Sequence, residues 1–277
     1  MPEKSNIALC RDPAELYLNV LKRVLVRWDE DKFVPMTNKG WLRPLVKRAC
    51  AARGLSIWQV KPFDAEARTF GRDWPDGATI IGAKRIENIQ FCIKTVLQDG
   101  VPGDLVEAGL WRGGASIFMR AALEAFGDAD RVVWCADSFK GWPVPNARKY
   151  PRDKNSVRHL QSHRALSLAM VKDNFRKHSL LDDRVKFLAG WFEDTLPTAP
   201  IGEIAVLRLD GDMYGSTMDV LTALYAKVSP GGFVIMNDYA NPGSDSRPAI
   251  DDFRRDHGIN EPIADIDGCG AYWRRLR

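Results

Sequence analysis

The sequence predicts an α/β protein with a mostly parallel sheet that is covered by helices on both faces. From residue 82 onward, short apolar runs alternate with longer amphipathic runs. Five of the apolar runs are continuous, which is typical of strands that are buried on both faces. Glycine or polar residues follow each of these runs, at the edge where open parallel sheets bind ligands.

The composition limits the number of domains and the kinds of partner that we expect. The chain has 277 residues, enough for one large domain with an extension, and 45% of them are hydrophobic. The net charge of +4 arises in residues 1–60, which carry 11 Lys and Arg against 6 Asp and Glu. Because acids interrupt this basic excess, it indicates a solvated helical face and no nucleic-acid partner.

The cysteines and the hydropathy of the chain predict where in the cell the protein is located. The five cysteines are scattered and form no Cys-x-x-Cys pair, so they indicate reduced thiols and no zinc site. No apolar run is long enough for a membrane span, and no signal peptide is apparent. We therefore expect a soluble, cytoplasmic protein without a membrane partner.

The N-terminal part, residues 1–75, is predicted to form a helical extension or cap ahead of a second domain at residues 76–277. Apolar side chains recur at helical spacing over residues 14–28. A second helix is predicted over residues 41–54. Residues 62–77 mix Pro, Gly, Asp and Arg, and are expected to form a connection.

The second domain is predicted to alternate strands with helices. The strands are expected over residues 104–109, 131–137, 184–190, 203–210 and 231–238. The helices are expected over residues 83–100, 113–127, 164–181, 216–228 and 247–258. Ser216 is the expected N-cap of its helix, with Asp219 three residues later. Two final strands, residues 261–267 and 271–275, predict an antiparallel hairpin at the sheet edge.

A glycine-rich loop follows the first of these strands. Gly109, Gly113 and Gly114 lie directly before a predicted helix, and glycine lets a backbone approach a ligand closely. The spacing does not fit the G-x-G-x-x-G dinucleotide pattern, and the Gly-Lys-Ser/Thr of a Walker loop is missing from it. A nicotinamide oxidoreductase is therefore disfavoured, while a tight structural turn stays an alternative.

Two acids lie beside this loop. Glu107 ends the same strand and Asp137 ends the next one. Asp137 is placed to accept hydrogen bonds from ribose hydroxyls, and Glu107 could meet a ligand ammonium. S-adenosylmethionine carries both of these groups, so the pair of acids predicts a site for it more strongly than the glycines alone.

Oxygen-bearing side chains also follow two later strands. Asp210 and Asp212 come after one strand, and Asn237 and Asp238 come after the next. Four converging oxygen donors suit a hard divalent ion, most readily Mg²⁺. Such an ion lowers the pKa of a substrate hydroxyl, and a nearby carboxylate can take the proton. The alternative is a purely structural set of turn residues.

The long loop at residues 139–163 is predicted to be a lid over the site of the molecule that carries the substrate hydroxyl. The N-terminal helices are expected to form the opposite wall of that site, or else an oligomer contact. His159 and His163 in this loop are an alternative general base. Exposed loop histidines without a catalytic role are the simpler interpretation.

Several segments together resemble the macrocin and mycinamicin O-methyltransferase family of antibiotic sugar methyltransferases, which includes the enzyme that methylates noviose in novobiocin. They are VEAGLWRGGAS, ADSFKGWP, AGWFEDTLP, LRLDGDMYGSTMDVL, and NDY followed by RPAIDDFRRDHG. The stretches AELYLNVLKRVL and ATIIGAKRIENI fit the family too. The resemblance extends over residues 16–272, which is nearly the whole chain.

The resemblance implies a class I methyltransferase fold that uses S-adenosylmethionine and Mg²⁺. It implies methyl transfer to a sugar hydroxyl on a glycosylated natural product by a homo-oligomer of two or four subunits. The implied cofactor-binding residues are Thr79, Ile80 and Ile81 at the methionine end, Glu107, Gly109, Trp111, Arg112, Gly113 and Ser116 around the methionine part, Asp137 with Ser138 beside the ribose, and Trp191 and Phe192 at the adenine.

The resemblance also implies the reacting end of the site. Asp210, Asn237 and Asp238 would hold the metal, with Asp210 beside the cofactor as well, and Asp212 would be the general base. The family usually has two aspartates where this chain has Asn237 and Asp238, so we expect weaker metal binding. A methyltransferase for a phenolic or catechol-like hydroxyl and a non-catalytic S-adenosylmethionine-binding module are the alternatives.

Overall fold

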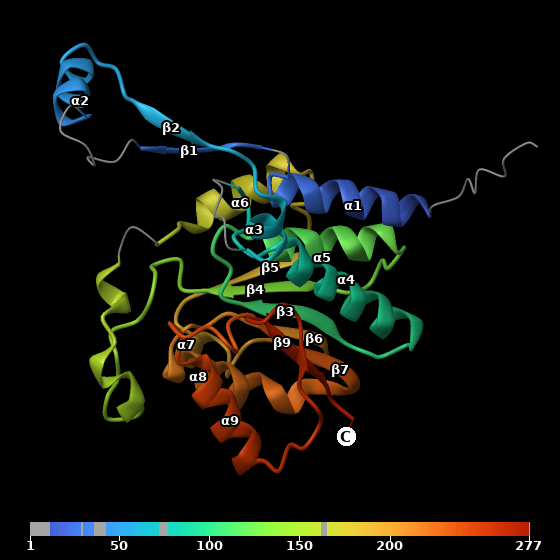
Figure 1. Ribbon diagram of the computed structural model, residues 1–277. Coiled ribbons are helices and arrows are strands. Elements are labelled where there is room, and N and C mark those ends of the chain that lie inside the picture. Colours follow the sequence, from blue (N-terminus) through green and yellow to red (C-terminus); the bar gives the residue numbers. More distant parts are fainter. Residues whose placement is uncertain (1–11, 29, 36–42, 72–76, 162–164, 277) are drawn as a thin grey trace, which may run out of the picture.

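A computed structural model of the chain describes residues 12–28, 30–35, 43–71, 77–161 and 165–276 (Figure 1). Its main feature is a seven-stranded, mostly parallel sheet. The strands are β3 (Asp104–Ala108), β4 (Val133–Asp137), β5 (Val185–Ala189), β6 (Ile204–Leu209), β7 (Val228–Met236), β8 (Ala264–Asp265) and β9 (Ala271–Arg274). They lie in the order β5-β4-β3-β6-β7-β9-β8, and β9 is antiparallel to both of its neighbours. The predicted sheet and its antiparallel final pair are confirmed.

Helices cover both faces of the sheet (Figure 1). One face carries α1 (Pro13–Leu25), α4 (Ala83–Gln98), α5 (Gly114–Ala125) and α6 (Leu168–Lys177). The other carries α7 (Phe192–Thr195), α8 (Tyr214–Leu224) and α9 (Ser246–Asp256). Successive strand residues point to opposite faces, so Leu105 packs with the first set of helices and Val106 with the second. This double burial explains why the strand runs are continuously apolar.

The first helix belongs to the same core as the sheet. Leu18, Leu21 and Leu25 of α1 are buried in the cluster that α4 and α5 form with the sheet. The ammonium group of Lys22 adds an ion pair with the Glu87 carboxylate of α4, at 3.2 Å.

The prediction of an all-helical N-terminal part is wrong. Strand β1 (Lys32–Pro35) pairs antiparallel with β2 (Trp58–Lys61), and α2 (Arg43–Ala51) lies between them in the chain. These strands have four residues each, too few to display a period of two, and their pairing is distant in sequence. A short helix, α3 (Ala65–Thr69), lies where a connection was expected.

The boundaries of α8 and β7 also differ from the prediction. The helix begins at Tyr214 with Met213 as its N-cap, so Ser216 lies inside the helix and is not its cap. It ends at Leu224 and passes through a 3₁₀ turn into β7, which contains the Pro-Gly-Gly at residues 230–232. Those residues were expected to end the helix.

The thiols of the described residues are free. Cys92 and Cys135 are buried, and burial raises the pKa of both thiols. Cys50 and Cys269 are partly exposed. No helix within the described part of the chain is both long and apolar enough to span a bilayer.

Candidate active site

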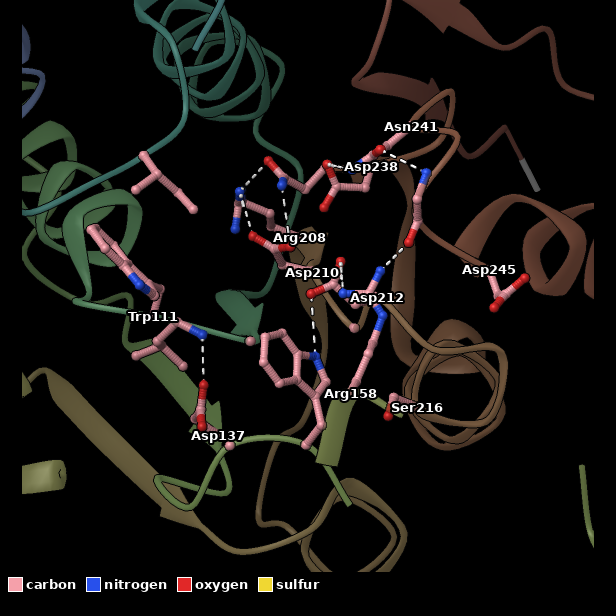
Figure 2. Close-up of a pocket in the computed structure, with 18 of the residues that line it drawn as sticks. Trp111, Asp137, Arg158, Arg208, Asp210, Asp212, Ser216, Asp238, Asn241 and Asp245 are labelled. Carbon is pink, nitrogen blue, oxygen red and sulfur yellow. Dashed lines mark hydrogen bonds and ion pairs between the residues drawn. The ribbon is translucent and has the colours of Figure 1, made fainter. Parts of the chain in front are cut away.

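A cavity of about 940 Å³ opens at the carboxyl edge of the sheet. The residues at or just beyond the ends of β3, β4, β5, β6 and β7 all line it, which confirms the edge that the sequence indicated. They are Gly109, Asp137, Gly190, Asp210 and Asn237. Figure 2 shows Trp111 and Asp137 on one side of this space and Asp210, Asp212 and Asp238 on the other.

Most of the residues predicted to bind the cofactor line this cavity. They are Thr79, Ile80, Ile81, Glu107, Gly109, Trp111, Asp137, Ser138, Trp191, Phe192 and Asp210. Three others do not line it within the described structure. Arg112 donates to the Gly77 carbonyl, Gly113 is the N-cap of α5, and the Ser116 hydroxyl donates to Glu107.

Gly109 is required by the packing of two strand ends. Its φ is +92°, and a Cβ there would lie 2.2 Å from the backbone oxygen of Asp210. The Asp210 N–H donates to the Ala108 carbonyl at 2.8 Å, so β3 and β6 stay paired up to this point. The glycine therefore lets Asp210 lie directly beside the loop that starts at residue 109.

Asp137 ties the glycine loop to the end of β4. Its carboxylate accepts the backbone N–H of Leu110 at 2.9 Å and that of Phe139 at 2.7 Å. Burial raises the pKa of Asp137, and these hydrogen bonds oppose the rise. A carboxylate with two backbone donors keeps further lone pairs, which could accept ribose hydroxyls.

Arg208 was missed by the sequence analysis and lies at the centre of the site. Its guanidinium donates to Glu107, to the Asn237 side-chain oxygen at 2.6 Å and to Asp210 at 3.2 Å. The side chains of Arg208 and Glu107 are only 2% and 1% exposed. Burial raises the pKa of Glu107, and the guanidinium opposes that rise. The signal in the sequence was a single arginine within an otherwise apolar strand, LRL.

The negative charge of Glu107 is thus already paired inside the protein. Its two carboxylate oxygens accept from the Arg208 guanidinium and the Ser116 hydroxyl. The contact of Glu107 with a ligand ammonium stays a prediction. Within the described structure, its immediate role is to hold Arg208 at the cavity wall.

Three aspartates converge at the lip of the cavity. One carboxylate oxygen each from Asp210, Asp212 and Asp238 lie within 4.8 Å of one another. Oxygens that bind one Mg²⁺ at about 2.1 Å lie roughly 3 to 4 Å apart, so this cluster fits the ion in donor type, and its oxygens would have to move slightly closer together to bind it. Burial, with Asp238 and Asp212 nearby, raises the pKa of Asp210 well above its ordinary value, while Arg208 opposes the rise.

Asn237 lies between this cluster and two arginines. Its side-chain oxygen accepts from Arg208 and, at 3.2 Å, from Arg85 of α4, whereas its NH₂ donates to Asp210 at 3.1 Å. In this arrangement Asn237 holds Asp210 in place and turns its oxygen toward the guanidiniums. Its predicted role as a metal ligand stays a prediction.

Asp212 has two partners from the predicted lid. The Trp142 indole N–H donates to its carboxylate at 3.2 Å, and the Arg158 guanidinium lies 3.6 Å away (Figure 2). Both side chains line the cavity. His159, in the 3₁₀ turn η2 (Arg158–Leu160), is not among the described residues that line it, and His163 lies outside the described residues.

Known proteins match the chain over nearly its whole length. The family model described as Macrocin-O-methyltransferase (TylF) matches residues 14–275. The mycinamicin III 3''-O-methyltransferase of Micromonospora griseorubida is 51% identical over 266 residues, 94% of this chain and 96% of the relative. A tetracenomycin-C 4'-O-methyltransferase of Streptomyces olivaceus, which acts on an 8-(2,3-dimethoxy-α-L-rhamnosyl) compound, is 47% identical over 96% of this chain and 95% of its own.

Solved structures match the fold as well. The O-methyltransferase NovP is 42% identical, with a TM-score of 0.80 over 95% of this chain and all of that one. The calicheamicin methyltransferase CalS11, at 18% identity and a TM-score of 0.54, shares the fold. The fold is that of a class I methyltransferase, as the resemblance implied. By the match of the family model and of these relatives, the chain belongs to the macrocin O-methyltransferase (TylF) family.

Proposed function

We propose that the protein transfers a methyl group from S-adenosylmethionine to a hydroxyl of a deoxysugar on a glycosylated natural product. The observation that carries this proposal is the aspartate cluster at the edge of a cavity of about 940 Å³. The relatives support the acceptor class, because the names of two of them specify a methyl acceptor in an antibiotic, one of them a rhamnoside.

The methyl donor would occupy the side of the cavity formed by β3 and β4. Asp137 would accept the ribose hydroxyls, Trp191 and Phe192 would flank the adenine, and the loop from Gly109 to Trp111 would pack against the methionine part. S-adenosylmethionine would supply a methyl group that is already activated toward a nucleophile. The protein then has to bring the acceptor oxygen into line with it, and positioning of this kind lowers the barrier considerably.

The acceptor hydroxyl would lie at the aspartate cluster. Asp210 and Asp238 would hold Mg²⁺, with Asn237 completing or orienting that set, and the ion would supply the Lewis acidity that makes a sugar hydroxyl more acidic. Asp212 would accept the hydroxyl proton as the oxygen attacks. Trp142 and Arg158 orient the Asp212 carboxylate before the acceptor arrives.

Labelled methyl donor and a panel of deoxysugar glycosides test this proposal. The wild-type protein should methylate a sugar hydroxyl, and Asp212→Asn should lower kcat by roughly 10²- to 10⁴-fold, as expected for loss of a general base. Asp245→Asn is the matched control, because Asp245 lines the same cavity but does not belong to the aspartate cluster. Calorimetry should show unchanged donor binding in both variants.

Two outcomes would contradict the proposal. Donor binding without turnover on any glycoside would favour a non-catalytic binding module. Turnover on phenols and catechols, with none on sugars, would place the acceptor in the other class.

We also propose a cytoplasmic homo-oligomer with no nucleic-acid or membrane partner, in which residues 1–75 form the cap and residues 76–277 form the methyltransferase domain. Exposed apolar side chains in the N-terminal part support self-association. They include Leu16, Val20 and Val24 on α1, Leu45 on α2 and Trp58 on β2. Light scattering on the purified chain should give the mass of two or four subunits, and a monomer at micromolar concentration would contradict it.

A further inference from the structure

The first turn of α8 receives its cap from a distant part of the chain. Met213 is the N-cap residue, and among the described residues it offers no side-chain cap to the helix. The first N–H groups of a helix have no partner within the helix itself. Here Asp153 supplies the acceptors, 62 residues before Gly215: its two oxygens accept the N–H of Tyr214 at 3.1 Å and that of Gly215 at 2.8 Å.

Asp153 is built into this position. It lies in the 3₁₀ turn η1 (Pro151–Asn155), and only 2% of its surface is exposed. Burial raises the pKa of its carboxyl, and the two backbone N–H groups oppose the rise. A buried carboxyl is costly unless it is hydrogen-bonded, so the position of Asp153 depends on the start of α8.

Gly215 makes the close approach possible. A Cβ at this position would lie 2.5 Å from the Tyr150 ring and 2.8 Å from the Asp153 carboxylate. Any larger residue at this position would push these groups away from the first turn of α8. Contact with residues 150–153 therefore explains the glycine.

A second contact lies one turn further along α8. The Asp219 carboxylate accepts from the Tyr150 hydroxyl and from the Lys149 ammonium, the latter at 2.8 Å. The rings of Tyr150 and Tyr214 also pack, with their centroids 6.0 Å apart. Residues 149–153 are therefore attached to the first two turns of the helix.

Residues 149–153 belong to a longer part of the predicted lid, residues 142–158, which we call the lid segment. Both ends of the lid segment contact Asp212. Trp142 and Arg158 contact the Asp212 carboxylate, and Arg158 also donates to the Gly243 carbonyl. Asp212 lies two residues before α8 and has a φ of +57°, in the left-handed region that non-glycine residues adopt at a cost. Such a conformation persists where the surroundings hold it.

We propose that Asp153 is a positioning residue: it caps α8 from within the lid segment and thereby fixes the backbone that carries Asp212. Closure of the lid segment and the position of Asp212 are therefore coupled. Opening the segment would remove the cap of α8 together with the contacts that Trp142 and Arg158 make to the Asp212 carboxylate. The importance of Asp212 rests on the proposed function, whereas the capping itself does not.

Hydrogen exchange and limited trypsin cleavage test the capping. Asp153→Ala and Gly215→Ala should each raise amide exchange at positions 214 and 215 by about fivefold, as expected for loss of a helix cap. Both should speed trypsin cleavage within the lid segment, at Arg148, Lys149, Arg152 and Lys154. Asp153→Asn should give intermediate protection, because its single side-chain oxygen can accept one of the two N–H groups whereas its NH₂ cannot accept the other.

Gly202→Ala is the control, because a Cβ there would meet no described atom within 4 Å. It should leave exchange and cleavage unchanged. Unchanged exchange and cleavage in Asp153→Ala would overturn the proposal, and so would faster exchange in Asp153→Asn than in Asp153→Ala. If Gly215→Ala does not fold, the two Asp153 variants still decide between these outcomes.

Steady-state kinetics test the link to Asp212. Asp153→Ala should lower kcat by about tenfold and leave the KM for the methyl donor within about twofold, with a smaller loss of kcat in Asp153→Asn. Loosened exchange and cleavage with an unchanged kcat would overturn the coupling. If the wild-type chain transfers no methyl group, the proposed function fails, and the exchange and trypsin results still decide whether Asp153 caps the helix.

Discussion

Replacing Arg208 with leucine should strongly destabilise the protein, because Arg208 is the shared donor of three polar groups. Glu107, Asp210 and Asn237 all accept from its guanidinium. After the change, the Glu107 carboxylate would remain 1% exposed with the Ser116 hydroxyl as its described partner. Burying a charge without its counter-charge carries a large desolvation cost.

The size of the effect follows from that burial. Removing one partner of a buried ion pair typically costs about 3–5 kcal/mol. For a chain of this length, each kcal/mol lowers the melting temperature by about 2–4 °C, so a fall of about 10 °C is expected. The double variant Glu107→Leu with Arg208→Leu should recover about half of the loss, since Asp210 and Asn237 still lack their donor.

Urea and thermal unfolding, followed by circular dichroism, measure these differences. The control is Arg176→Leu, since the Arg176 side chain is 59% exposed and pairs only with the exposed Asp173 among the described residues. It should change the free energy of unfolding by less than about 1 kcal/mol. A loss for Arg208→Leu as small as that of the control would refute the reasoning, as would a double variant less stable than Arg208→Leu.

Three further changes test individual parts of the site. Gly109→Ala should cost about 3 kcal/mol in unfolding experiments, because its Cβ would lie 2.2 Å from the Asp210 carbonyl oxygen, whereas Gly202→Ala should be nearly neutral. Asn237→Asp should tighten Mg²⁺ binding roughly tenfold in calorimetry, since it adds a carboxylate beside Asp210; unchanged affinity would indicate a purely structural cluster. Asp137→Ala should weaken donor binding at least tenfold by calorimetry, and donor affinity equal to wild type would exclude its role at the ribose.

The sheet could be predicted from the sequence because each strand carries its own signal. Burial between two layers of helices leaves a continuous apolar run, as in β6, where all six residues are buried. The strand ends then identified the edge of the cavity, since the carboxyl ends of parallel strands share one edge. Asp137 and Asp210 were found in this way.

The contacts within the site could not be predicted, because they join residues that are far apart in the chain. Arg208 looked like one polar residue in an apolar strand, and its partner Glu107 lies 101 residues away. A local pattern assigned the N-cap of α8 to Ser216, but the N-cap residue is Met213, and Asp153 in the lid segment supplies the acceptors for the first N–H groups. Local sequence patterns carry no information about such partners.

The most direct measurement of the central claim is transfer of a ¹³C-labelled methyl group from S-adenosylmethionine to a deoxysugar glycoside, with EDTA and with Mg²⁺ added back. The aspartate cluster predicts a labelled methoxy group on the sugar, no transfer in EDTA, and full recovery with Mg²⁺. Asp210→Ala should show no transfer under either condition. Transfer at the wild-type rate in EDTA and in Asp210→Ala would contradict the metal role, and a label on any group other than a sugar hydroxyl would contradict the proposed acceptor.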